Sequence, residues 1–137
     1  MANISITNND LGSVELADGE FRDDTVVFAG ADTFYEGTIL ARTVGGGNDD
    51  KLVLFVNGGV ATTNGTPAAV LTKDLVATGA GDEVTRVLVA GKVRKEKLRI
   101  DPATDDTGID NDVIDQLRRT GIIPIDTKEL NIVDTQD

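Results

Sequence analysis

The chain has 137 residues, 39% of them hydrophobic and 27% charged, which fits one domain with room for a terminal arm or tail. Its 13 basic and 24 acidic residues give a formal net charge of −11, which disfavours binding to nucleic-acid phosphates and to anionic membranes. The sequence contains neither His nor Cys, which excludes His-based catalysis, His-based zinc sites, disulfides and thiolate nucleophiles. We expect neither a signal peptide nor a membrane span, because no apolar run is long enough.

The first 20 residues are predicted to form an extended arm with little core of its own. Apolar and polar residues alternate near its start, in the spacing of a short strand. These residues are Ile4, Ser5, Ile6 and Thr7. A frayed terminus is the alternative interpretation. The domain itself is then expected over residues 21–137.

From residue 25 onward, short β-branched runs alternate with turn clusters, which predicts a mainly β domain. The expected strands lie at residues 25–28, 38–44, 52–56, 68–71 and 84–93. The run 52–56 does not alternate, so it could be buried on both faces. The run 84–93 is expected to be half-buried, with its charged side chains facing outward. Asn57-Gly58 predicts a tight hairpin turn with a return strand starting at Val60.

One short helix is predicted over residues 110–120, near the C-terminus. It has an N-cap residue, an apolar face at helical spacing and a glycine where a left-handed residue is expected. These structural residues are Asp110, Val113, Ile114, Leu117 and Gly121. Residues 122–125 are expected to return as a strand, and Pro124 places that strand near a sheet edge.

No complete catalytic or cofactor motif is present, so we expect no enzyme, no metal site, no cofactor and no small-molecule substrate. Gly91-Lys92 lacks the remainder of a phosphate-binding loop, and Gly79-Ala-Gly81 lacks the third glycine of a dinucleotide fingerprint. The acidic residues of 101–112 fit a helix cap and a solvated loop better than a calcium loop. A carboxylate pair for glycoside hydrolysis stays open on counting alone, although five aromatic residues are few for binding sugars.

One basic stretch stands out in this acidic chain. It comprises Lys92, Arg94, Lys95, Lys97 and Arg99. We interpret it as a solvated strand face or as a patch that meets an acidic partner, rather than as a nucleic-acid site.

The order of these features resembles the head decoration protein D family of tailed bacteriophages, the lambda-type capsid cement proteins. The resemblance runs from near Phe21 to Ile123 and rests on four segments in order. They are Glu36-Gly-Thr-Ile-Leu-Ala41, Ala68-Ala-Val-Leu-Thr-Lys-Asp74, Val87-Leu-Val-Ala-Gly-Lys-Val93 and Val113-Ile-Asp-Gln-Leu-Arg-Arg-Thr-Gly-Ile-Ile123. The segment 69–71 lacks the family's glycine, and Ala90 replaces its usual arginine.

The resemblance implies a β-clip-like domain that assembles as a homotrimer on the outer surface of the virion. Such trimers bind the major capsid protein at three-fold and quasi-three-fold sites and stabilise the expanded head against the pressure of packaged DNA. In the family, the N-terminal arm pairs with strands of the capsid. Two alternatives stay open: another virion structural module, associated with a tail or fibre, and a trimeric dUTPase-like nucleotide pyrophosphatase, which Gly108-Ile-Asp110 faintly suggests.

Overall fold

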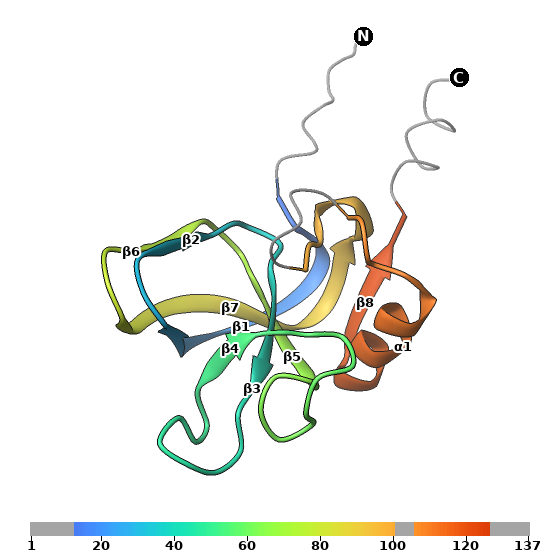
Figure 1. The fold of residues 1–137 in the computed structure, drawn as a ribbon. Coiled ribbons are helices and arrows are strands. Elements are labelled where there is room, and N and C mark those ends of the chain that lie inside the picture. Colours follow the sequence, from blue (N-terminus) through green and yellow to red (C-terminus); the bar gives the residue numbers. More distant parts are fainter. Residues whose placement is uncertain (1–12, 101–105, 127–137) are drawn as a thin grey trace, which may run out of the picture.

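The computed structural model describes residues 13–100 and 106–126. Within them, five strands close into a mixed β-barrel, and the last strand in the order returns to the first (Figure 1). In order around the barrel, the strands are β1 (Glu15–Phe28), β4 (Leu52–Leu54), β3 (Ile39–Arg42), β5 (Pro67–Leu71) and β7 (Gly81–Arg94). The predicted mainly β architecture is confirmed.

Further elements cover the barrel. Strand β8 (Ile122–Ile125) pairs in parallel with β7, and β2 (Asp32–Phe34) pairs with β6 (Leu75–Ala77) as a separate two-stranded sheet. A 3-10 helix, η2 (Lys95–Lys97), and the α-helix α1 (Asn111–Thr120) lie between β7 and β8 in the sequence.

The long pairing of β1 with β7 corrects the predicted arm boundary. The two strands are antiparallel and pair from Glu15 opposite Val93 to Phe28 opposite Gly81. Val14 is fully buried in the core, immediately before this pairing begins. Residues 13–20 therefore belong to the barrel, because they contribute a buried core side chain and the first pairings of β1 with β7. The predicted capsid-binding residues 4–7 lie outside the described residues.

Neighbouring side chains on the central strands enter two different cores on opposite faces of the sheet, because strand residues alternate in direction. One core receives residues from all five barrel strands and therefore fills the barrel interior. Its members on those strands are Val26, Phe28, Leu40, Leu52, Ala69, Leu71 and Val87. Phe34 and Ala77, from β2 and β6, complete it, and the Phe28 and Phe34 rings stack with centroids 4.2 Å apart.

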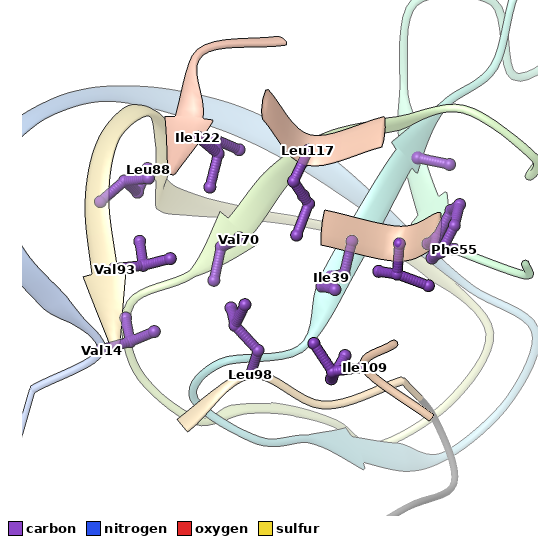
Figure 2. Packing of buried hydrophobic residues seen from close by; sticks show 12 residues of the cluster. Val14, Ile39, Phe55, Val70, Leu88, Val93, Leu98, Ile109, Leu117 and Ile122 are labelled. Atoms are coloured by element: carbon purple, nitrogen blue, oxygen red, sulfur yellow. The ribbon is translucent and has the colours of Figure 1, made fainter. Parts of the chain in front are cut away.

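The second core lies between the outer face of β3, β5 and β7 and the helix α1 (Figure 2). Ile39, Val70 and Leu88 point from the sheet toward Leu117 and its neighbours. The strand predicted at 84–93 is therefore not half-buried at Leu88, because α1 and β8 cover that part of its outer face.

The helix predicted over residues 110–120 is confirmed. The Asp110 carboxylate accepts a hydrogen bond of 3.1 Å from the backbone N–H of Val113, and Gly121 adopts a left-handed φ of 95° at the other end. Val113 and Leu117 are buried, and Ile114 is half-buried beside them. The helix could be predicted from the sequence because its caps and its apolar face all lie within this one short segment.

The hairpin predicted at Asn57-Gly58 is wrong. A turn does form there, since the Gly59 N–H donates to the Val56 carbonyl at 3.0 Å, but the described chain has no strand again until Pro67. Of the two central residues only Gly58 has a positive φ, 84°. A type I′ turn needs positive φ at both, so this turn does not direct the chain back along β4.

Candidate binding surfaces

An apolar groove of about 510 Å³ opens where β1 and β4 separate. These two strands run parallel and, in the part of the chain that the structure describes, pair with each other at one position, Val26 with Leu52. The rest of the barrel wall has longer ladders, above all the one between β1 and β7. The seam between β1 and β4 is therefore the weakest closure of the barrel, and the groove lies directly beyond it.

Side chains that follow this pair on both strands line the groove. Val27 and Phe28 come from the end of β1, and Val53 and Leu54 come from β4. Val56, which is 45% exposed, continues the apolar lining into the loop after β4. The sequence did not predict this groove. Its one signal was the non-alternating run 52–56, which indicated burial on both faces where the structure has a partly open wall.

The rim of the groove is polar but almost uncharged. Asn48, Thr63 and Asn64 contribute side chains from two loops, and among the described lining residues Asp32 is the one that carries a charge. Such a surface is unusual on a chain with a net charge of −11. It offers apolar contact and two strand ends, which suit the binding of an apolar segment.

A cluster of charged side chains braces the barrel beside the seam. The Asp24 carboxylate accepts hydrogen bonds from Arg42 at 2.6 Å, from the Thr25 backbone N–H at 2.9 Å and from Arg22 at 3.0 Å. Burial of Asp24 by itself would raise its pKa, but the bonds from these three donors outweigh burial and leave the pKa lowered. Arg42 also donates to the Asp50 carbonyl at 2.9 Å, so the cluster joins β1, β3 and the loop after β3.

Much of the basic stretch is used inside the molecule. Arg94 donates from Nε to the Ser13 carbonyl at 3.0 Å, and Lys95 lies 3.4 Å from the Asp106 carboxylate. The Arg99 guanidinium lies over the Tyr35 ring. These contacts hold the start of β1 against the end of β7 and fix the chain that follows β7. They favour a structural role for these residues over the predicted solvated strand face.

Asp110, the acid of Gly108-Ile-Asp110, caps α1, and Ile109 beside it is buried in the second core. The residues of this motif therefore have structural roles in the described fold, which account for their presence without a nucleotide. In residues 13–100 and 106–126, no group of three or more Asp or Glu side chains is placed to hold a metal ion. The acidic residues 101 and 105 lie outside the described residues.

Comparison with protein-family models, with curated protein sequences and with solved structures finds no match to this chain. Within the described residues, α1 is too short and too polar to cross a membrane.

Proposed function

We propose that this protein is a bacteriophage capsid decoration protein. In this proposal, homotrimers of a β-clip-like domain bind the major capsid protein at three-fold and quasi-three-fold sites on the outside of the head. The residues that carry the family resemblance support it, because they form the framework of the fold. They lie along β3, β5 and β7 and through α1 into β8.

The observation that carries the proposal is the position of the N-terminal segment relative to a closed barrel. Ser13 is held by Arg94, and Arg94 also pairs with Ile125 of β8, so both ends of the described fold leave from the same end of β7. In this proposal, the twelve residues that precede the closed barrel attach the domain to another protein.

The residues of that segment indicate how it would attach to the capsid. Ile4 and Ile6 alternate with Ser5 and Thr7, so a strand formed by them would add main-chain hydrogen bonds to an exposed sheet edge and place both Ile side chains in pockets. Three such arms in one trimer act together, so that a modest affinity of each arm becomes a tight attachment of the whole. The net charge of −11 per chain keeps the free protein soluble and away from nucleic acid.

The test compares two variants that gain the same charge in the arm. Expanded heads lacking decoration are incubated with the wild-type chain, with Ile6→Asp or with Asn8→Asp, and bound protein is measured by sedimentation and by electron microscopy. We expect trimeric density at three-fold positions, a loss of occupancy of on the order of tenfold or more for Ile6→Asp and little change for Asn8→Asp. Absence of binding to heads would reject the proposal, and binding to tails would favour the alternative virion module.

A further inference from the structure

We propose that Asn57 is a site of spontaneous deamidation, in which the backbone nitrogen of Gly58 attacks the side-chain amide, whereas the fold protects Asn64 in the same loop. Asn57-Gly58 and Asn64-Gly65 are the two Asn-Gly pairs of the sequence. Such pairs are the most susceptible to this reaction, because glycine has no side chain to hinder its own nitrogen. The reaction depends on the loop and not on the proposed binding to a capsid.

The chemistry requires a Gly58 N–H that is free to lose its proton. The nitrogen then forms a bond to Cγ of Asn57, the bond from Cγ to Nδ2 breaks, and Nδ2 takes up the proton and leaves as ammonia. Water opens the resulting succinimide ring at either of its two carbonyl carbons, which gives aspartate or isoaspartate. A hydrogen bond that occupies the attacking N–H, or a peptide too tightly packed to turn toward Cγ, prevents the first step.

The turn at Asn57 leaves the attacking nitrogen available. Among the described residues, no group accepts a hydrogen bond from the Gly58 N–H. Apart from its two chain neighbours, no described residue has an atom within 4 Å of the position that a Cβ of Gly58 would take. Both residues are exposed, so the peptide between them has room to rotate and water can reach the ring.

The peptide between Asn64 and Gly65 is held from several sides. The Gly65 N–H donates to the Val60 carbonyl at 2.8 Å, so this nitrogen is already occupied. The Asn64 carbonyl accepts the Val56 N–H at 2.8 Å, and the Gly59 carbonyl fills the place where a Cβ of Gly65 would be. Asn64 and Gly65 are both half-buried. The loop must therefore open locally before Asn64 can react, and this requirement slows the reaction.

Deamidation at Asn57 would alter the contact between this loop and α1. The Gln116 Nε2 donates to Asn57 Oδ1 and to Asp112 Oδ2, each at 3.1 Å. A carboxylate at position 57 would therefore lie near that of Asp112 and be repelled by it. Isoaspartate also adds one carbon to the main chain, so the turn could not keep its present geometry. One further negative charge would join a chain whose net charge is −11.

A single tryptic peptide reports on both sites, because no Lys or Arg lies between Lys51 and Lys73. The folded full chain is incubated for days at mildly alkaline pH and then digested briefly. Fragmentation mass spectrometry locates the increase of about 1 Da that replacement of NH2 by OH produces. We expect Asn57 to react at least about tenfold faster than Asn64, because Asn64 must wait for local opening. In guanidinium chloride, where the loop is unfolded, the two rates should agree to within about threefold.

Two matched variants repeat the test on the intact protein. Ion-exchange chromatography detects the added charge, which Asn64→Gln should gain at the wild-type rate. Asn57→Gln should gain it much more slowly, because glutamine would have to form a larger ring. Equal rates at the two positions of the folded chain would overturn the inference. An Asn57 that stays intact in the folded chain while it reacts in guanidinium chloride would overturn it as well.

Discussion

Asp24 shows how a single partly buried carboxylate can tie three parts of the barrel together. Its bonds to Arg42, Arg22 and the Thr25 N–H favour the ionised form, so its pKa in the folded protein lies below the usual value of 3.8 despite the opposing effect of burial. The ionised side chain therefore stabilises the fold at pH values above 3.8, and this contribution is lost as the pH falls through the lowered pKa of the folded state.

Asp24→Asn should consequently reduce the free energy of unfolding at pH 7 and leave a smaller loss at pH 2, where the wild-type side chain is also being neutralised. Urea unfolding at the two pH values measures the difference. Asp23→Asn, at the exposed neighbouring position, is the control and should leave the pH dependence close to that of the wild-type chain. An equal cost of Asp24→Asn at both pH values would contradict the assigned electrostatic role.

Leu117 joins the helix to the barrel. Its side chain is fully buried in the second core and points toward the sheet (Figure 2). Leu117→Ala should lower the free energy of unfolding by about 2–5 kcal/mol, because it removes apolar contacts and leaves a cavity. Arg118→Ala, at an exposed position on the same helix, should change it by less than about 0.5 kcal/mol. Similar urea midpoints for the two variants would mean that the helix does not pack as described.

At the scale of elements, the N-terminal boundary has a direct consequence. Deletion of residues 1–12 removes none of the described strands, so the shortened chain should keep a cooperative thermal transition close to that of the full chain. Deletion of residues 1–20 removes Val14 from the core and the first pairings of β1 with β7, so it should abolish that transition or lower its midpoint greatly. Circular dichroism melts distinguish the two. Equal melting of both shortened chains would restore the longer predicted arm.

Local signals predicted some elements correctly and others not. The helix was predictable because Asp110, Gly121 and the apolar face all lie within twelve consecutive residues. The strand expected after Asn57-Gly58 could not be predicted in this way, because it would form only if the following residues paired with β4. In the structure, the Asn64 carbonyl accepts the Val56 N–H at 2.8 Å, and the loop closes on itself. Pairing between distant segments decided the outcome, and a short pattern carries no information about it.

The groove was hidden from the sequence for the same reason. It exists because β1 and β4, which are distant in the sequence, separate after Val26 and Leu52. No residue type marks such a separation. The arm residues 4–7 could be selected by the alternation of apolar and polar residues alone, but the sequence of this chain does not identify the surface that they bind.

At the scale of the whole molecule, the two cores share the walls that separate them. Strands β3, β5 and β7 place side chains in both, so neither core can be lost while the other keeps its walls. We expect a single unfolding transition in urea by both fluorescence and circular dichroism, despite the physical separation of the cores.

Changes in different cores should nevertheless add. Val87 lies in the barrel interior and Leu117 in the second core. The combined variant of Val87→Ala and Leu117→Ala should lose the sum of the two single losses to within about 0.5 kcal/mol. A combined loss much smaller than that sum would show that the two side chains are coupled through the sheet.

The position of the two ends of the described fold has a mechanical consequence. Ser13 and Ile125 both lie beside Arg94, so a force applied between the two ends acts on the ladders of β1 and β8 with β7 from one end. The hydrogen bonds of those ladders then break one after another, as a zipper opens, and each rupture needs little force. A load that pulls opposite ends of β1 and β7 apart must instead shear many bonds of the antiparallel pair at once. The same domain is therefore compliant when stretched by its termini and stiff when loaded along its longest ribbon.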